Sequence, residues 1–343
     1  MSSDQMELAV NNLLKYYPVV SRGIILKKRI GDVHAVDDVT FSVMKGETFG
    51  LVGESGCGKS TTAKLILNLE YPDMGEVYFK GENITKAFLE GNKDKILSLR
   101  RKMQYVFQNP YQSLDPRMTV ADIITEPFAI HANVPKSKWS DRLLELIHLV
   151  GLEDYHTQRY PHEFSGGQRQ RICLARALAV DPELLIADEP VASLDVSIRA
   201  QVLNLMQDLQ KKFGLTYIYI SHDLSTVRHI SNRVAVMYLG KFVEIANVDD
   251  LYEKPLHPYS EALISAIPIP DPTGKSKQKR IILRGEVPSP INPPAGCRFH
   301  PRCNYAMDMC KKSIPALAEV KTGHFVACFL HHKEKAKPTK IGA

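Results

Sequence analysis

The chain has 343 residues, 44% hydrophobic and 24% charged, enough for one large domain plus a smaller one. Its net charge of +6 fits phosphate ligands or a negative membrane face as well as nucleic acid, so charge alone selects no partner. No apolar run approaches the roughly 18 residues that cross a bilayer, and the N-terminus lacks the layout of a signal peptide. We therefore expect a cytosolic protein, in which disulfides are rare.

From the N-terminus to about residue 250, short β-branched segments alternate with helical ones. Residues 48–52 (TFGLV), 183–188 (ELLIAD) and 215–221 (LTYIYIS) have the continuous apolar character of fully buried strands. Residues 75–84 predict a hairpin at a sheet edge, and residues 112–180 predict a helical insertion. Strands that alternate with helices predict an α/β fold with a parallel sheet covered on both faces.

The composition changes near residue 255, because twelve of the 21 prolines lie from Pro255 onward. Residues 268–280 have the character of a basic linker, and residues 287–297 that of an extended, turn-rich chain. We therefore expect one domain over residues 1–255 and a second over residues 256–343.

A phosphate-binding loop is predicted at residues 53–60, where GESGCGKS fits G-x-x-x-x-G-K-[ST] between a buried strand and a helix. Glycines at this spacing let backbone N–H groups point at phosphate oxygens, and the following helix adds its positive end. Lys59 is expected to reach the β- and γ-phosphates, and Ser60 to bind Mg²⁺. The predicted nucleotide contacts are Gly53, Ser55, Gly56, Cys57, Gly58, Lys59, Ser60 and Thr61.

Polar residues follow two other buried strands, and ligands of doubly wound sheets lie beyond the carboxyl ends of strands. Asp188 ends the segment ELLIAD and is predicted to be the second Mg²⁺ anchor. Glu189 comes next and is predicted to polarise the attacking water. His222 follows the third strand and is predicted to sense the γ-phosphate.

A second candidate anion site opens the helical segment QRQRICLARAL. Ser165 is a good N-cap, and the bare N–H groups of Gly166 and Gly167, followed by Gln168, can approach an anion closely. A capped helix start explains the same residues equally well, so the motif is weak in isolation.

The motifs together resemble the ATP-binding cassette (ABC) family over residues from about 10 to 255. FSGGQ (164–168) is similar to the family signature, Gln108 in VFQNP to the Q-loop, SLD (193–195) with Asp195 to the D-loop, and SHD (221–223) to the switch histidine. Tyr17 stands where the family places an aromatic ring on adenine, and Tyr16 is the alternative.

The ABC resemblance implies a P-loop fold with a RecA-like parallel sheet, an edge antiparallel β subdomain and a helical subdomain at about 112–180. It implies two cassettes packed head to tail, so that the signature of each faces ATP bound by the other. It also gives Glu189, His222 and Gln108 catalytic roles, with Gln108 joining Ser60 and Asp188 at Mg²⁺.

Four cysteines cluster near the C-terminus: Cys297, Cys303, Cys310 and Cys328. Such a cluster in a reducing compartment favours a metal over disulfides. The absence of closely spaced cysteine pairs favours an iron–sulfur cluster over structural zinc. For zinc, His300 and His324 are the alternative ligands. Arg298, Arg302, Lys311 and Lys312 would offset the charge of a cluster, or are merely solvated.

The segments HPYSEALISAIP and SPINPPAGCRFHPRC resemble the carboxyl extension of ATPase subunits of dipeptide/oligopeptide permeases, in the version typical of the F-type member of the ATPase pair. That resemblance implies a [4Fe–4S] cluster on the four cysteines, with zinc as the alternative. It implies an ATPase on the cytoplasmic face of the inner membrane, paired with a second ATPase, two transmembrane permeases and an external peptide-binding protein, and no nucleic-acid partner. Nickel or sugars could replace peptides as the cargo.

Two alternatives belong to other classes. A non-transport ABC ATPase could act on nucleic acid or the ribosome, although the sequence has neither the long heptad arms nor the second phosphate loop that such proteins carry. An iron–sulfur assembly protein would use the four cysteines catalytically.

Overall fold

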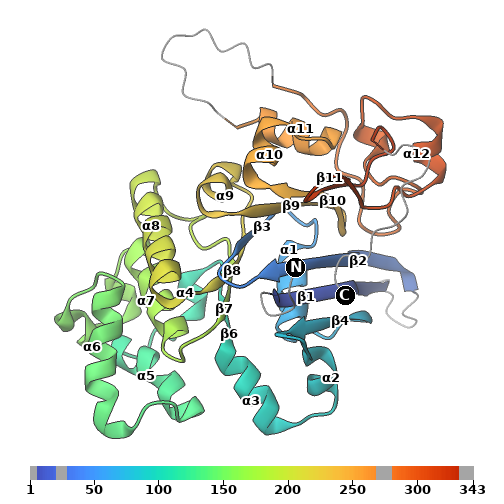
Figure 1. Ribbon diagram of the computed structural model, residues 1–343. Helices are drawn as coiled ribbons and strands as arrows, with labels where there is room; N and C mark the ends of the chain where they lie inside the picture. The colour runs from blue at the N-terminus through green and yellow to red at the C-terminus, as the bar shows by residue number, and fades with distance from the viewer. Residues whose placement is uncertain (1–5, 21–28, 268–279, 332–343) are drawn as a thin grey trace, which may run out of the picture. The chain divides into compact units, whose positions relative to one another are not determined.

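The computed structural model describes residues 6–20, 29–267 and 280–331 (Figure 1). These residues fall into two compact units. The first unit comprises Met1–Glu7, Met44–Thr48 and Lys86–Ser221. The second comprises Leu8–Val43, Phe49–Thr85 and His222–Ala343. Each unit is built from segments that are far apart in the sequence.

The first unit contains three parallel strands, β6 (Met103–Val106), β7 (Leu184–Asp188) and β8 (Thr216–Ile220), with β7 in the middle. Every residue of β7 and β8 is buried, as their uninterrupted apolar sequences predicted. The predicted strands at 183–188 and 215–221 are therefore confirmed. Asp188 ends β7 and is followed directly by Glu189, so the carboxylates lie at the carboxyl end of the strand.

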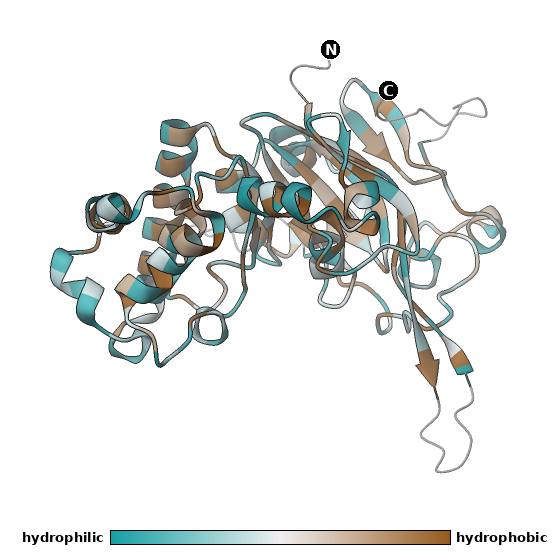
Figure 2. Ribbon diagram, turned by 90° about the horizontal axis from the view of Figure 1, so that it is seen from below, coloured by the Kyte–Doolittle hydropathy of each residue, from teal (hydrophilic) through white to brown (hydrophobic). Residues whose placement is uncertain are grey.

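Helices make up most of the rest of the first unit: α2 (Ile84–Leu89), α3 (Lys93–Lys102), α4 (Pro110–Ser113), α5 (Val120–His131), α6 (Trp139–Leu149), α7 (Gly166–Leu178) and α8 (Val196–Phe213). Short 3₁₀ segments at Lys136–Lys138, Asp154–Gln158 and Pro161–Glu163 join them. In Figure 2 the helices carry both brown and teal residues, as expected of helices that bury one face. α7 packs against α4, α5, α6 and α8, which fixes the start of the helix that carries the signature residues.

The second unit contains an antiparallel sheet with the order β2 (Arg29–Met44), β1 (Met6–Val20), β4 (Met74–Phe79) and β5 (Glu82–Asn83). β4 and β5 form the hairpin predicted at residues 75–84. β1 and β2 are long strands that the sequence did not predict. They carry Tyr16 and Tyr17 in the same unit as the phosphate-binding loop.

A second sheet of this unit places β3 (Thr48–Val52) parallel to β9 (Arg233–Tyr238) and continues through β10 (Lys241–Asn247), β12 (His324–Val326) and β11 (Ala318–Lys321). The helices of this unit are α1 (Lys59–Ile66), α9 (Leu224–Ile230), α10 (Val248–Glu253), α11 (Pro258–Ser265) and α12 (Asp308–Lys312). Residues 280–331, here called the C-terminal segment, thus supply strands to a sheet that contains β3. None of the helices in the described ranges is long and apolar enough to cross a membrane.

Candidate nucleotide-binding site

The loop at residues 53–60 joins β3 to α1 in a conformation that requires glycine. Gly53, Gly56 and Gly58 have φ of 151°, 77° and 112°, a region that side chains disfavour. A Cβ on Gly53 would lie 2.2 Å from the carbonyl oxygen of Met237, and one on Gly58 would lie 2.0 Å from that of Ala35. The strand–loop–helix context that the sequence predicted is therefore present.

Lys59 is buried, with 5% of its surface exposed, and folds back over this loop. Its Nζ donates to the carbonyl oxygens of Gly53 at 2.8 Å and Glu54 at 3.1 Å, and lies 3.8 Å from Cys57 Sγ. These contacts hold the cation inside the curve of the loop. Burial also raises the pKa of the Cys57 thiol.

The two candidate adenine residues differ in their surroundings. The Tyr17 hydroxyl bonds to Glu70 and to the side chain of Thr61, which belongs to the first turn of α1. The Tyr16 ring is stacked on His34 with centroids 3.9 Å apart, and burial followed by the charge of Asp37 raises its pKa to about 12. Tyr17 is thus the tyrosine that contacts the loop region, and Tyr16 is engaged elsewhere.

In the first unit, the predicted catalytic carboxylates have defined partners. Asp188 is 4% exposed; its Oδ2 accepts from the Tyr105 hydroxyl at 2.6 Å, whereas its Oδ1 is buried with no hydrogen-bond partner among the described residues. An unsatisfied buried carboxylate oxygen is an acceptor that a hard divalent cation would satisfy. Burial, and then the charge of Asp188, raises the pKa of Tyr105.

Gln108 and Glu189 are brought together, since Gln108 Nε2 donates to Glu189 Oε2 at 2.9 Å. Glu189 has a φ of 47°, unusual for a residue other than glycine, and its N–H bonds to the carbonyl of Ile220 at 2.9 Å. Such backbone strain is common at functional sites. The structure therefore joins the Q-loop glutamine with the carboxylate predicted to orient water.

Ser165 caps α7, as predicted. Its Oγ accepts from the N–H of Gln168 at 3.3 Å, and the Gln168 side chain accepts from the N–H of Ser165 at 3.0 Å. This reciprocal pair is a capping box, so both residues have a local structural role whether or not they also contact phosphate. Gly167 is buried, and a Cβ there would lie 2.2 Å from Ile198 Cγ2 in α8.

Asp195 caps the next helix, α8, and accepts from the N–H of Ile198 at 3.0 Å. That bond, and then one from Ser197, lowers the pKa of the Asp195 carboxyl. His222 is exposed and begins the second unit, directly after Ser221 ends the first. The second unit thus holds the loop, the tyrosines and His222. The first holds the carboxylates, Gln108 and the signature.

The prediction of an iron–sulfur or zinc site was wrong. Within residues 6–20, 29–267 and 280–331, no group of three or more His, Cys, Asp or Glu side chains is placed so that it could hold a metal. Burial, and then the neighbouring cysteines, raises the pKa of the Cys328 thiol to about 11. The four residues in question are Cys297, Cys303, Cys310 and Cys328, all free thiols here.

The groups predicted to serve such a site have other partners. His324 Nε2 lies 2.7 Å from Glu244 Oε1 in a buried pair, and His300 Nδ1 lies 2.9 Å from the carbonyl of Cys297. Arg298 and Arg302 are each 8% exposed and pair with Asp37 and Glu54. Neither arginine is a solvated surface charge.

Sequence reasoning missed Glu54, Tyr259 and Asp37 at this site. The Glu54 N–H donates to the Tyr259 hydroxyl at 2.9 Å, and its carboxylate receives both terminal nitrogens of Arg302. Glu54 occupies a position of the loop pattern that any residue can fill, and Arg302 is 248 residues away. The sequence carries no periodicity that could pair them.

Two family models match the chain, the ABC transporter family over residues 36–192 and the C-terminal region of oligopeptide/dipeptide transporters over residues 243–310. The oligopeptide transport ATP-binding protein AppF of Bacillus subtilis (strain 168) is 51% identical over 324 residues, covering 94% of this chain and 97% of that protein. The chain belongs to the ABC transporter family. The dipeptide transport ATP-binding protein DppF of Escherichia coli (strain K12) is 48% identical, covering 93% of this chain and 92% of that protein.

Solved structures agree with this ABC assignment. The ATP-binding cassette MJ0796, in a dimeric post-hydrolysis state bound to ADP and Pi, has a TM-score of 0.61 and 26% identity, covering 70% of this chain and 98% of that chain. The ABC ATPase fold and the resemblance to the oligopeptide/dipeptide group are thus confirmed, as is the enzyme class, an ATPase. The relatives are named as transport proteins, which does not favour an action on nucleic acid or the ribosome.

Proposed function

We propose that this chain is the ATP-hydrolysing subunit of an importer that carries dipeptides or oligopeptides across the cytoplasmic membrane. The observation that carries the proposal is 51% identity to an oligopeptide transport ATP-binding protein along 94% of the chain, together with the match of residues 243–310 to the C-terminal region of such transporters. The chain would lie on the cytoplasmic face of the membrane, with two permeases, a second ATPase and an external peptide-binding protein as partners.

The loop unit would bind the triphosphate. The N–H groups of the glycine loop and the start of α1 present partial positive charge, and Lys59 would exchange its loop carbonyls for phosphate oxygens. Thr61, Cys57, Gly56 and Ser55 would complete the cradle. The Tyr17 ring would stack on the adenine, since this tyrosine contacts the first turn of α1.

Magnesium fits the acceptor that Asp188 presents in the first unit, because its Oδ1 is buried and unsatisfied, and Ser60 lies in the first turn of α1 in the second unit. Ser60, Asp188 and Gln108 would hold the ion, which supplies charge neutralisation at the β- and γ-phosphates. Glu189, which accepts a hydrogen bond from Gln108 Nε2, would hold the attacking water. His222 would contact the γ-phosphate.

Ser165, Gly166, Gly167 and Gln168 would face a nucleotide held by a partner cassette, with Asp195 beside them. A nucleotide bound by two surfaces makes its full set of contacts only in the closed dimer. ATP binding would therefore favour closure of the dimer, and hydrolysis would allow the dimer to open. The dimeric state of the related cassette MJ0796 supports this arrangement.

The test is co-purification. A tagged chain expressed in its natural host, isolated from detergent-solubilised membranes, should carry two hydrophobic permease subunits and a second ATP-binding subunit. Recovery with ribosomes or DNA that dissociates as salt is raised would contradict the transport proposal.

A further inference from the structure

A short stretch of the C-terminal segment, Cys297–Cys303, contacts the phosphate-binding loop through Arg302. Arg302 lies in the 3₁₀ segment His300–Arg302, and its two terminal nitrogens donate to the two carboxylate oxygens of Glu54 at 2.8 and 3.2 Å. This is the bidentate geometry that gives guanidinium–carboxylate pairs directional strength. Because Arg302 is 8% exposed, solvent screens the pair weakly.

Glu54 is held on three sides. Its carboxylate accepts from Arg302, its N–H donates to Tyr259, and its carbonyl accepts from Lys59 Nζ at 3.1 Å and from the N–H of Cys57 at 3.3 Å. Glu54, which pairs with Arg302, is therefore also one of the two residues whose carbonyl oxygens accept from Lys59. A shift of Glu54 would move the lysine and the loop with it.

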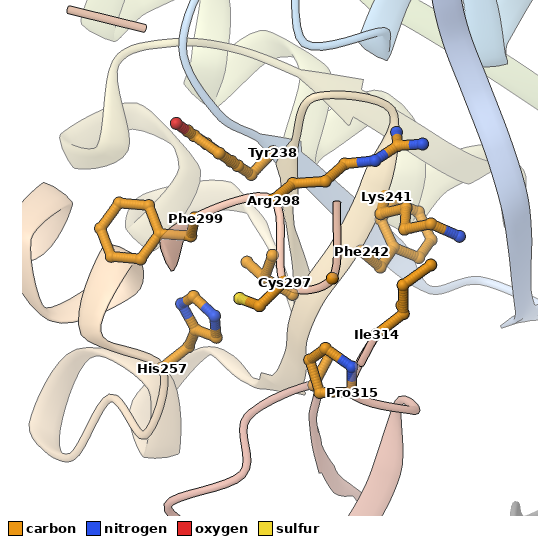
Figure 3. A pocket seen from close by; sticks show the side chains of 12 residues that line it. Tyr238, Lys241, Phe242, His257, Cys297, Arg298, Phe299, Ile314 and Pro315 are labelled. Carbon is orange, nitrogen blue, oxygen red and sulfur yellow. The ribbon is translucent and has the colours of Figure 1, made fainter. Parts of the chain in front are cut away.

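An aromatic cluster fixes the stretch that carries Arg302. Phe299 is 1% exposed, and its ring centroid lies 5.3 Å from that of Tyr238 and 5.4 Å from that of Tyr259. In Figure 3 the Phe299, His257 and Cys297 side chains lie on one side of this region, and the Arg298 guanidinium points away from them. The two arginines of this stretch have different partners, because Arg298 pairs with Asp37 and Arg302 with Glu54.

Arg298 supports the loop from its other side. It donates to the carbonyl of Leu239 and pairs with Asp37, and the neighbouring Gly240 donates its N–H to the carbonyl of Cys57 at 2.8 Å. One stretch of the C-terminal segment thus reaches the loop directly at Glu54 and, through the two intermediate residues Leu239 and Gly240, at Cys57.

We propose that Arg302 is a positioning residue for the phosphate-binding loop: it neutralises Glu54 and fixes the loop in the form that accepts a nucleotide. The argument rests on the proposed function, since it needs this loop to bind ATP. Without Arg302, the carboxylate of Glu54 would stand uncompensated one residue after Gly53 and would repel a triphosphate. The C-terminal segment would then set nucleotide affinity although it contributes no phosphate ligand.

The experiment measures the Kd for MgATP and the steady-state KM and kcat of the full chain, together with its melting temperature. Arg302→Gln is expected to raise Kd and KM about tenfold and to change kcat less than threefold, because the lost interaction acts on binding. Arg302→Lys keeps the positive charge but loses the paired hydrogen bonds of the guanidinium. Its Kd and KM should therefore lie between those of Arg302→Gln and the wild type. Lys321→Ala, which removes the exposed pair with Asp250 in the same segment, should leave Kd unchanged.

A double-mutant cycle separates positioning from general destabilisation. If Arg302 acts through Glu54, then Arg302→Gln should change Kd much less in a Glu54→Gln background than in the wild type. A folded Arg302→Gln protein with wild-type Kd and KM would overturn the proposal. Should that variant fail to fold, Arg302→Lys takes its place, and a folded Arg302→Lys protein with wild-type Kd and KM would likewise overturn the proposal.

The same binding assay distinguishes failure of the proposed function from failure of the role proposed for Arg302. Lys59→Ala should abolish MgATP binding while the wild type binds. A wild type that does not bind MgATP contradicts the ATPase assignment itself. A wild type that binds, with Lys59→Ala inactive and Arg302→Gln unchanged, contradicts the role of Arg302 alone.

Discussion

Gly167 provides a test of what the signature glycines do, because the structure gives them different surroundings. An alanine Cβ at Gly167 would lie 2.2 Å from Ile198 Cγ2, a methyl group on a branched side chain that cannot swing far within α8. At Gly166 the nearest atom would be Leu194 Cδ2 at 3.2 Å, the far end of a flexible chain. Gly167→Ala should therefore strain the contact between α7 and α8, and Gly166→Ala should not.

The expected magnitude follows from two opposing effects. Forcing an extra methyl group into a packed contact lowers the free energy of unfolding by about 1–3 kcal/mol. Replacing glycine by alanine within a helix raises it by about 0.5–1 kcal/mol. Gly167→Ala should therefore lower the free energy of unfolding by up to about 2.5 kcal/mol, a fall in Tm of up to about 4 °C for a chain of this length. Gly166→Ala should leave Tm unchanged or slightly raised.

The assay is thermal unfolding without nucleotide, followed by ATPase measurement. Ile198→Ala removes the opposing methyl group, so the Gly167→Ala and Ile198→Ala double variant should lose less stability than the sum of the two single changes. If Gly167→Ala melts no lower than Gly166→Ala, the packing argument is refuted. If both glycine variants lose ATPase activity although only one loses stability, the phosphate-binding role of the signature is supported.

Three further results are expected. Glu189→Gln should bind MgATP but hydrolyse it at least a hundredfold more slowly and elute as an ATP-dependent dimer in size-exclusion chromatography; loss of ATP binding would argue against its role. Tyr17→Ala should weaken ATP binding by about 1–3 kcal/mol, whereas Tyr16→Ala should act mainly on Tm; equal Kd values for the two variants would contradict the assignment. Burial raises the pKa of the Glu244 carboxyl, but its bonds with His324 and with the backbone N–H groups of Leu256 and His257 outweigh burial, so the folded pKa lies below the ordinary 4.5. Its stabilisation is therefore present above that value and lost as pH falls through the folded pKa, and the difference in Tm between wild type and Glu244→Gln should shrink below pH 4.5; a constant difference would contradict this linkage.

The sequence by itself determined the features that depend on local backbone and on uninterrupted apolar runs. The glycine spacing of residues 53–60 predicts a strand–loop–helix because Gly53 and Gly58 adopt φ values that few other residues tolerate. The strands at 183–188 and 215–221 were predictable because a strand buried on both faces needs apolar residues throughout. The cap at Ser165 was predictable because its partner, Gln168, lies within the same turn.

Only the tertiary structure decided which distant groups meet. The cysteine spacing predicted a metal site, but spacing fixes neither the direction of a side chain nor the distances among four of them, and the described residues form no such site. The arginines beside those cysteines were expected either to offset the charge of a cluster or to be solvated. Instead, Arg298 and Arg302 pair with Asp37 and Glu54 within the second unit. A pairing over 248 residues leaves no local pattern, because it arises from the way β-strands and aromatic side chains bring two parts of the chain together.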